Sequence, residues 1–522
     1  MTKNFYFLFC MIIFIFIIIY YYYIIIILYY YIIIMSDNKY LQKKRKKDKN
    51  NKNENNNNNN NNNKKIHIDK TNSEMLKQSE LFISECKKHP LSLINLPPNP
   101  VIYPNTNALT FTIHKTFNKA RASTLTLPHG EVPTPIYMPV GTKGAMKGLL
   151  SCDLERMHCK LMLSNTYHLA LEPGDEFLKK NFESISNKNA IHNYMKWPNN
   201  VLTDSGGFQI ASLTHLSCRS EKGVEFISHI NNDNRKILLT PEKSIEIQNN
   251  IGSDIIMCLD DVITPISSKN EIYDACERSI RWLDRCITAH KKKDTQNLFG
   301  IVQGGIDLNL REMACEEMIK RNLPGYAIGG MAGGESKEDF WKVVDICTNF
   351  LPNDKPRYLM GIGYPIDLVV CSLLGVDMFD CVFATRTARF GNAFTNYGIK
   401  KINKEENKFV FNEGICKECD CEVCGKYSRS YLYYIFNKNP RGAVLISFHN
   451  VYYLLRLVGR IRESIMKGRV NEFVREFIEK YYGQKGCPDW VVKALRKAGC
   501  DVGFLDQMPK CNDEEFDYYE EE

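Results

Sequence analysis

The sequence predicts an α/β fold, a (β/α)8 or TIM barrel followed by a small cysteine-rich subdomain. Between residues 130 and 385, eight short apolar runs recur, and each ends abruptly in polar or glycine-rich residues. Helix-like segments separate most of these runs, and apolar strands that alternate with helices form parallel sheets. Eight such units predict a closed barrel. A doubly wound open sheet shares the alternation, but no G-x-G-x-x-G follows an early strand.

The N-terminal leader, residues 1–34, has an unusual composition. Residues 4–34 carry no charge and are long enough to cross a bilayer, which is typical of a membrane anchor or an uncleaved signal. Nearly every residue there can also be encoded with A and T alone. We therefore favour the alternative that the leader is not translated and that Met35 is the start.

The next segment, residues 35–105, is predicted to be a disordered basic arm rich in Asn and Lys. Residues 36–70 contain eleven Lys or Arg, four Asp or Glu, and nine consecutive Asn at 55–63. We expect a solvated linker, with nucleic-acid contact or a nuclear address as alternatives. At the other end, residues 501–522 form an acidic tail. The net charge of the chain is +8, and the body between these ends is basic, which suits a polyanionic partner.

The barrel with its N-terminal hairpin is predicted to span residues 106–400. Ahead of the barrel strands, LTFTIHKT and STLTLPHGEVPTP indicate antiparallel hairpin strands that plug its far end. Between strands, Thr240 can cap a helix in TPEKSIEIQNNIG and Pro241 fits its first turn. The eight predicted strands are IYMPVGT, LMLSNTYH, VLTDSGGFQ, IIMCLDDV, NLFGIVQGG, YAIGGMAGG, RYLMGIG and MFDCVF.

Polar residues follow the predicted strands, and the C-terminal ends of barrel strands face one mouth. We therefore expect Asp204, Asp260, Gln303, Gly330 and Asp380 to converge there. Two carboxylates on different strands can cleave a glycosidic bond with retention: one attacks the anomeric carbon and the other protonates the leaving group. Asp380 and Asp204 fit these roles. The structural alternatives are a buried salt bridge from Asp380 to an arginine downstream, and a turn-capping role for Asp204.

Glycine pairs next to these acids suggest a flat ligand. Gly206-Gly207 and Gly329-Gly330 leave backbone exposed, and Phe208 could stack on a ring placed against it. Asp260 and Gln303 offer an acceptor and a mixed donor and acceptor, which suit the edge of a purine-like base. The alternatives are a helix N-cap for Asp260 and a plain loop position for Gln303.

The cysteine-rich part, residues 401–500 with its C-terminal helices, is predicted to hold one structural Zn²⁺. Cys419-x-Cys421-x-x-Cys424 places three thiolates at chelating spacing, and His449 follows 25 positions later. Three cysteines and one histidine close a tetrahedral shell with no open position. Cys416 competes with His449 as the fourth ligand. The other fifteen of the nineteen cysteines are scattered, which is typical of a reduced, intracellular protein.

Taken together, the motifs resemble the tRNA-guanine transglycosylase family from about residue 108 to about residue 500. They are TDSGGFQ, LDDV, VQGG, AIGGMAGGE, RYLMGIG, DMFDCVFATRTARFG and the C-x-C-x-x-C…H cluster. The family is a (β/α)8 barrel with a zinc subdomain that exchanges a base in the tRNA anticodon without breaking the chain. The resemblance implies that Asp380 is the nucleophile on ribose C1′ and that Asp204 is the general acid/base.

The resemblance also implies where the substrates bind. Phe208 would stack on the base, and Val140 and Met360 would line its pocket. Arg386 and Arg389 would grip the uridines that flank the wobble guanine of a U-G-U loop. The implied base-binding residues are Phe208, Asp260, Gln303, Gly329, Gly330, Met331, Gly333 and Met360.

The size of the residues at positions 333 and 262 indicates which members of the family this chain resembles most. Bacterial members, which take a small deazaguanine, tend to have valine at the position of Gly333 and cysteine at that of Val262. Gly333 would open room for the cyclopentenediol of queuine, so the resemblance is to eukaryotic members. These exchange guanine for queuine in tRNAs with GUN anticodons (Asp, Asn, His, Tyr) and form a heterodimer with a homologous non-catalytic subunit. One departure is Ala384, which replaces a usual proline and predicts a less rigid loop before Arg386.

The alternative function is that of the non-catalytic partner subunit, which would be expected to lack the acid pair that this chain has. We expect a cytoplasmic location. Association with a membrane periphery or with the mitochondrial outer surface is the alternative, and it depends on the leader being made.

Overall fold

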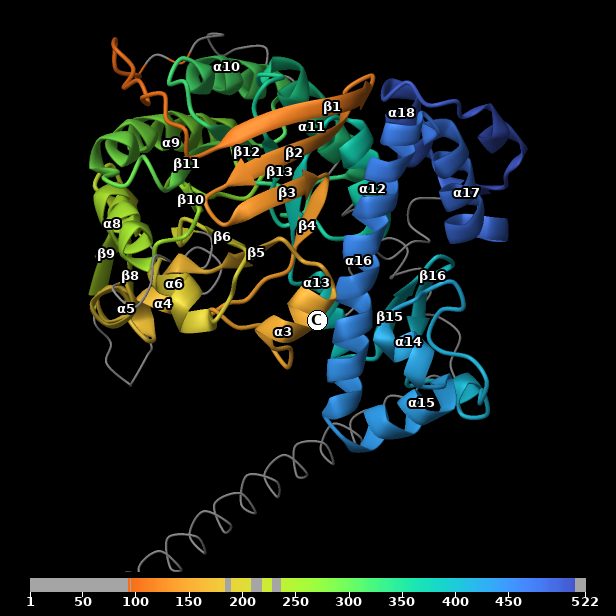
Figure 1. Cartoon of the computed structure of the whole chain (residues 1–522). Coiled ribbons are helices and arrows are strands. Elements are labelled where there is room, and N and C mark those ends of the chain that lie inside the picture. The colour runs from red at the N-terminus through yellow and green to blue at the C-terminus, as the bar shows by residue number, and fades with distance from the viewer. Residues whose placement is uncertain (1–92, 94, 184–188, 208–217, 228–235, 512–522) are drawn as a thin grey trace, which may run out of the picture. The chain divides into compact units, whose positions relative to one another are not determined.

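The structure is a computed structural model of the whole chain, and it describes residues 93, 95–183, 189–207, 218–227 and 236–511 (Figure 1). These residues belong to one compact unit. The predicted leader, most of the predicted basic arm, Phe208 and residues 512–522 of the acidic tail lie outside the described residues. Within the described ranges, no helix is both long enough and apolar enough to cross a membrane.

Eight parallel strands form the centre of the fold, and they pair with their neighbours in chain order. The last strand returns to pair with the first, with Asp380 opposite Met138. Between the first strand and the second, the amide of Gly141 donates to the carbonyl of Leu163 over 2.7 Å and closes the ring. The barrel prediction is confirmed, and each predicted run contains one strand. The strands are β4 (Ile136–Met138), β5 (Leu161–Ser164), β6 (Asn200–Thr203), β10 (Ile255–Met257), β11 (Asn297–Val302), β12 (Gly325–Ile328), β13 (Arg357–Leu359) and β14 (Met378–Asp380).

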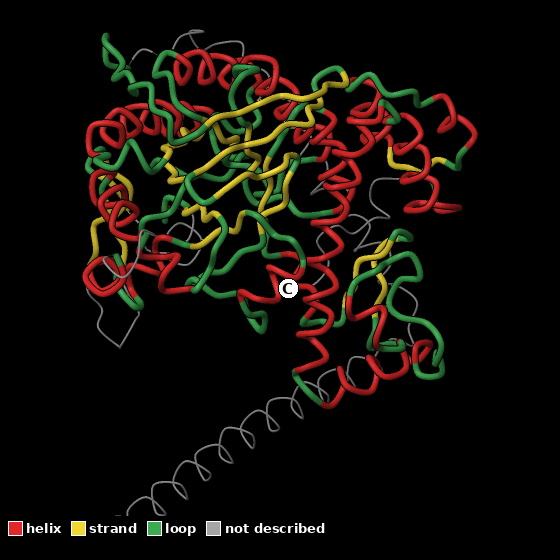
Figure 2. Tube along the Cα trace, in the orientation of Figure 1, coloured by secondary structure: helices red, strands yellow, loops and turns green. Residues whose placement is uncertain are grey.

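Helices surround these strands (Figure 2), which explains why the strands are apolar throughout instead of alternating. The predicted cap is confirmed: the Thr240 hydroxyl accepts from the amide of Lys243 over 3.2 Å, and Pro241 is the first residue of its helix. The helices of the barrel are α3 (Ser151–Arg156), α4 (Thr166–Leu171), α5 (Asp175–Phe182), α6 (Ala190–Met195), α8 (Pro241–Ile251), α9 (Lys269–Ala289), α10 (Leu308–Ile319), α11 (Lys337–Phe350), α12 (Pro365–Leu373) and α13 (Phe383–Ala388).

The predicted plug is an antiparallel sheet of β1 (Thr110–Phe117), β2 (Ala120–Leu127) and β3 (Gly130–Thr134). Arg121 forms a buried ion pair with Asp377, the residue before β14. His129 Nδ1 lies 2.6 Å from the carboxylate of Asp254, the residue before β10. Because both partners precede barrel strands, the sheet covers the N-terminal end and leaves the C-terminal mouth open. A second small sheet follows β6 and consists of β7 (Cys218–Ser220), β8 (Gly223–Ile227) and β9 (Lys236–Leu239).

The C-terminal part is organised by one long helix, which runs beside the barrel in Figure 1. This helix, α16 (Arg441–Lys467), is attached to the plug sheet through Arg462, which donates to the carbonyl of Thr134 at the end of β3 over 2.8 Å. The helix ends at Gly468, whose positive φ of 71° separates it from the next helix of the predicted C-terminal helical part. The elements are β15 (Asn392–Thr395), β16 (Gly398–Lys401), η2 (Glu405–Asn407), α14 (Glu422–Lys426), α15 (Arg429–Lys438), α16 (Arg441–Lys467), α17 (Val470–Tyr482), η3 (Gly483–Lys485), β17 (Cys487–Pro488), α18 (Asp489–Lys497), η4 (Gly503–Gln507) and β18 (Lys510–Cys511).

Candidate active site and metal site

Polar side chains from three neighbouring strands meet at the C-terminal mouth of the barrel. Gln303, which follows β11, donates its side-chain amide to Asp260 Oδ2 over 2.7 Å. Ser205, next to Asp204 at the end of β6, donates to Asp260 Oδ1 over 3.3 Å. The structure therefore brings together residues that are up to 98 positions apart in the sequence, between Ser205 and Gln303.

Asp380 is the last residue of β14, and only one of its two carboxylate oxygens is held. Oδ1 accepts the hydroxyl of Tyr358 over 2.5 Å and the amide of Gly361 over 2.8 Å. Within the described residues, Oδ2 accepts no hydrogen bond, and the residue is partly exposed. Burial raises the pKa of Asp380 above its usual value, while both hydrogen bonds oppose that rise.

Asp204 directly follows β6 and is buried. Its two oxygens accept the side-chain amide of Asn165 and, over 2.9 Å, the backbone amide of Thr166. Burial raises the pKa of Tyr358, and the negative charges of Asp380 and Asp204 both add to that rise. The two carboxylates therefore act on the same hydroxyl, as expected for acids that share one mouth.

Asp260 is an acid in an unusually dry environment, with 4% of its surface exposed. Desolvation raises its pKa from 3.8 to about 6, although the hydrogen bonds from Gln303 and Ser205 favour the charged form. The charge of the neighbouring Asp261 adds to the rise. Near neutral pH, a modest change in surroundings can therefore change the protonation of Asp260.

The backbone at Gly329 and Gly330 approaches Gln303 closely. A β-carbon at Gly330 would lie 2.3 Å from Gln303 Oε1, and φ there is +70°. Any side chain at this position would displace the amide that holds Asp260. At Gly333 the space for a β-carbon is filled by the ring of Pro265, whose Cδ would lie 2.6 Å away.

Several supporting residues were not assigned a role from the sequence. Tyr358 holds Asp380, and Asn165 holds Asp204. Arg311 is fully buried and donates to the carbonyls of Val302, Gly305 and Gly329 beneath the glycine pair. Glu335 accepts the amides of Ala332 and Gly333 over 2.7 and 2.9 Å. The sequence offers one signal for such a residue: Asn165 stands at the end of a predicted strand, as Asp204 and Asp380 do.

The remaining predicted contact residues lie around the mouth. Arg386 and Arg389, in α13 and just after it, have exposed side chains and make no ion pair with the described residues, so the salt-bridge alternative for Asp380 is not observed. Met331 is buried beside the glycine pair, and Met360 follows β13. Val140 lies at the closure of the barrel, in a bridge with β5.

The predicted metal ligands form a compact group. His449 Nδ1 lies 3.7, 3.4 and 3.3 Å from the sulfurs of Cys419, Cys421 and Cys424. Metal–sulfur bonds of about 2.3 Å and metal–nitrogen bonds of about 2.0 Å predict tetrahedral edges of about 3.5 Å between these atoms. His449 Nε2 donates to the carbonyl of Phe394 over 2.7 Å, which leaves Nδ1 free to bind a metal. The donor set therefore fits a four-coordinate metal ion, with His449 and not Cys416 as the fourth ligand.

A second group of metal-binding residue types lies at the opposite end of the barrel: His129, His192 and Asp254. The two imidazole rings stack with centroids 3.6 Å apart and planes 13° apart. One nitrogen of each ring approaches the carboxylate of Asp254, at 2.6 and 3.1 Å. Because the ring planes are nearly parallel, the nitrogens lie side by side and do not converge on one point. We interpret this group as a hydrogen-bonded contact between the plug and the barrel.

A barrel with acids at its C-terminal mouth and an adjoining site of three cysteines and one histidine agrees with the tRNA-guanine transglycosylase family that the sequence motifs resemble. A family model described as queuine tRNA-ribosyltransferase matches residues 116–483, and the chain belongs to this family. It is 48% identical over 394 residues to the queuine tRNA-ribosyltransferase catalytic subunit of Schizosaccharomyces pombe, covering 74% of this chain and 95% of that protein. The same name applies to the Caenorhabditis elegans relative, which is 43% identical over 74% of this chain and 97% of its own. A queuine tRNA-ribosyltransferase of Thermus thermophilus is 43% identical, over 74% of this chain and 98% of that protein.

Proposed function

We propose that this protein exchanges the wobble guanine of tRNAs with GUN anticodons for queuine, through a covalent bond between Asp380 and ribose C1′. One observation supports the role of Asp380 above all others. Its Oδ1 is fixed by Tyr358 and Gly361, whereas Oδ2 accepts no hydrogen bond from the described residues and lies on a partly exposed side chain. A carboxylate held by one oxygen is oriented, and its other oxygen is available as a nucleophile.

The exchange takes place in two displacements at C1′. In the first, Asp380 Oδ2 forms a bond to C1′ as the bond from C1′ to N9 of guanine breaks, and protonated Asp204 supplies the proton that guanine needs to leave. In the second, Asp204 removes a proton from the incoming base, which bonds to C1′ and releases Asp380. The two inversions give net retention. The amides of Asn165 and Thr166 orient Asp204 for both steps.

The base would lie against Gly329, Gly330 and Met331, with Asp260 and Gln303 at its edge. This proposal is supported by the hydrogen bond between Asp260 and Gln303, which aligns an acceptor and a carbonyl side by side. Phe208 is proposed to stack on the base. The preference for queuine is supported by the similarity to relatives that bear its name. Because Pro265 fills the space next to Gly333, the side group of queuine would need Pro265 to shift or would follow another path.

Arg386 and Arg389 are proposed to bind the anticodon loop beside the wobble position. They are exposed and make no ion pair within the described ranges, so their charges are available to phosphates. Arg386 also lowers the pKa of Cys381, although burial raises that pKa overall. Cys381 directly follows the proposed nucleophile Asp380, so this effect supports the proposal that Arg386 acts beside it.

The metal is proposed to be one structural Zn²⁺, held by Cys419, Cys421, Cys424 and His449. Three thiolates and an imidazole favour zinc over the hard cations that prefer oxygen, and four protein ligands leave no position for substrate. When bound, the ion would tie α14 to α16. Through His449 Nε2 and the carbonyl of Phe394, it would also fix β15, which follows α13 and Arg389 in the chain.

For the assembly and the location, the proposals remain those made from the sequence: a heterodimer with a homologous non-catalytic subunit, in the cytoplasm. The names of two relatives specify a catalytic subunit. The alternative, that this chain is itself the non-catalytic subunit, is disfavoured by Asp380 and Asp204, which are both present and oriented. The proposed domains are a barrel at 106–400 and a zinc subdomain with helices at 401–500.

Single-turnover trapping tests the proposed function. The protein is mixed with a tRNA bearing a GUN anticodon, without free base, and the covalent adduct is resolved on a denaturing gel. We expect an adduct with the wild type and none with Asp380→Asn. Asp377→Asn is the matched control, because Asp377 lies just before the same strand but is paired with Arg121 at the opposite end of the barrel. Folded Asp377→Asn protein should form the adduct. An adduct that persists in Asp380→Asn refutes the assignment.

A further inference from the structure

Two consecutive buried carboxylates follow β10, and they point to opposite sides of their segment. Asp260 faces the mouth, where it is bound by Gln303 and Ser205. Asp261 faces outward, to α9: its backbone amide donates to the hydroxyl of Ser279 over 2.9 Å. Because adjacent residues share one peptide unit, whatever fixes Asp261 also fixes the direction of Asp260.

The carboxylate of Asp261 is 1% exposed and lies between two arginines. Arg278 of α9 donates to Oδ2. Arg219 of β7 places Nε 3.5 Å from Oδ1, which accepts no hydrogen bond from the described part of the chain. A buried carboxylate without such cations would be strongly disfavoured beside a second acid.

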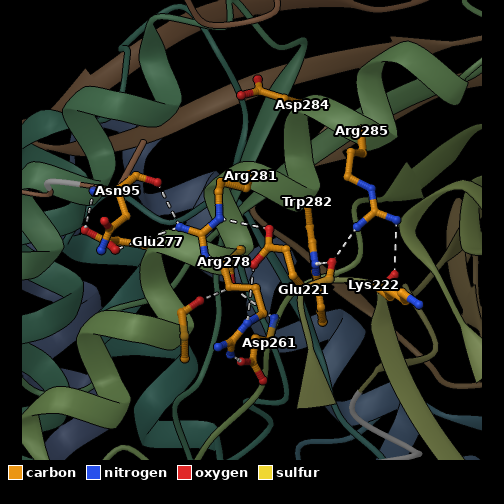
Figure 3. Close-up of polar contacts among 12 residues, drawn as sticks. Asn95, Glu221, Lys222, Asp261, Glu277, Arg278, Arg281, Trp282, Asp284 and Arg285 are labelled. Carbon is orange, nitrogen blue, oxygen red and sulfur yellow. Dashed lines mark hydrogen bonds and ion pairs between the residues drawn. The ribbon is translucent and has the colours of Figure 1, made fainter. Parts of the chain in front are cut away.

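The same face of α9 also holds the turn between β7 and β8 (Figure 3). Arg281 forms a two-pronged ion pair with Glu221, at 2.9 Å for both bonds. Arg285 donates to the backbone carbonyls of Glu221 and Lys222 over 2.7 and 3.1 Å. The small sheet after β6 is thereby attached to α9, and this attachment keeps Arg219 beside Asp261.

We propose that Asp261 and Arg278 are positioning residues that hold Asp260 in the orientation needed to bind the exchanged base. The inference rests on the proposed function, and it goes beyond it by assigning base affinity to an ion pair outside the pocket. Asp261 touches neither base nor ribose in this proposal. Its carboxylate fixes the segment from outside, and the charge of Arg278 balances the second acid beside Asp260.

The experiment compares two isosteric variants, Asp261→Asn and Asp284→Asn. Asp284 is a suitable control because it also forms a buried carboxylate–arginine pair that involves α9, with Arg321 at 2.8 Å for both bonds, but away from the base segment. Each variant is assayed for exchange of labelled guanine into tRNA, with the guanine and tRNA concentrations varied separately. Thermal unfolding of both variants establishes that their losses of stability are comparable.

We expect Asp261→Asn to raise the KM for guanine about tenfold, with kcat at saturating guanine and the Kd for tRNA changed less than about twofold. Asp284→Asn should leave all three unchanged. If Asp261→Asn does not fold, Arg278→Lys decides, because it keeps the charge but loses the planar fork and should shift the same KM in the same direction. An unchanged KM for guanine, a loss confined to kcat, or an equal shift in Asp284→Asn would overturn the inference. Failure of the wild type to exchange guanine would instead refute the proposed function.

Discussion

The hydroxyl of Tyr358 gives the most direct test of how Asp380, the proposed nucleophile, is prepared for attack. It donates to Asp380 Oδ1 over 2.5 Å, from the neighbouring strand β13. Tyr358→Phe removes this donor and leaves the ring in place. Because the hydrogen bond lowers the pKa of Asp380 against the effect of burial, its loss should raise that pKa. Attack on C1′ needs the ionised carboxylate, so formation of the adduct should weaken at low pH.

The size of the effect follows from the strength of the bond. A hydrogen bond to a charged group contributes about 1.5–3 kcal/mol, and about 1.4 kcal/mol corresponds to one pKa unit. The acid limb of the rate of adduct formation should therefore move up by about one to two pH units. The remaining bond from Gly361 limits the shift. Well above the new pKa, Asp380 is ionised in both proteins, so their rates should approach each other.

Single-turnover adduct formation, measured between about pH 5 and 9, provides the assay. Tyr137→Phe is the control. Tyr137 is a buried tyrosine on the adjoining strand β4, and its hydroxyl donates over 2.6 Å to the carbonyl of Cys381, not to the carboxylate of Asp380. If the acid limb of Tyr358→Phe lies where that of Tyr137→Phe lies, the proposed control of Asp380 by Tyr358 is wrong.

Three further predictions concern stability, metal and tRNA. The folded-state pKa of Asp260, about 6, lies above its usual 3.8, so ionisation of Asp260 lowers the stability of the protein as pH rises through that range. Asp260→Asn should therefore raise the free energy of unfolding, measured by urea titration, by about 3 kcal/mol at pH 8 and by almost nothing below pH 4. His449→Ala should lower zinc affinity at least about tenfold by competitive chelator titration, whereas Cys416→Ser should not change it. Replacing Arg386 and Arg389 together by Gln should weaken tRNA binding and, for two phosphate contacts at about 0.7 each, lower its salt slope by about 1.4 in filter-binding assays; an unchanged slope would exclude phosphate contact.

The barrel could be predicted because each of its strands can be recognised from a short stretch of sequence. Each strand is buried on both sides, so it appears in the sequence as an apolar run, and each run stops where the strand reaches the mouth. The polar residue at that point, such as Asp204 or Asp380, is therefore identifiable from the amino-acid pattern alone. The same reasoning predicted the plug and the cap at Thr240, because each depends only on residues that are close together in the chain.

The supporting contacts could not be predicted because they depend on the distance between strands. Nothing in its own segment distinguishes Tyr358 from a core tyrosine until β13 is placed beside β14. Arg311 lies on a helix, and its role depends on carbonyls that converge beneath the glycine pair. The fourth metal ligand was ambiguous for the same reason: Cys416 is closer in sequence, but α16 brings His449 to the other three sulfurs.

Buried acids have different partners at the two ends of the barrel, and the difference bears on the reaction proposed at the mouth. At the N-terminal end, Asp254 lies between two histidines and Asp377 is paired with Arg121. At the mouth, Asp380 and Asp260 accept hydrogen bonds from neutral groups and form no ion pair with the described residues. Because unpaired buried acids cost stability, this arrangement is understandable if a ligand donates hydrogen bonds to Asp260 and positive charge develops beside Asp380. The departure of a base from C1′ generates such charge on the ribose, and a mouth with unneutralised carboxylates is already oriented to stabilise it.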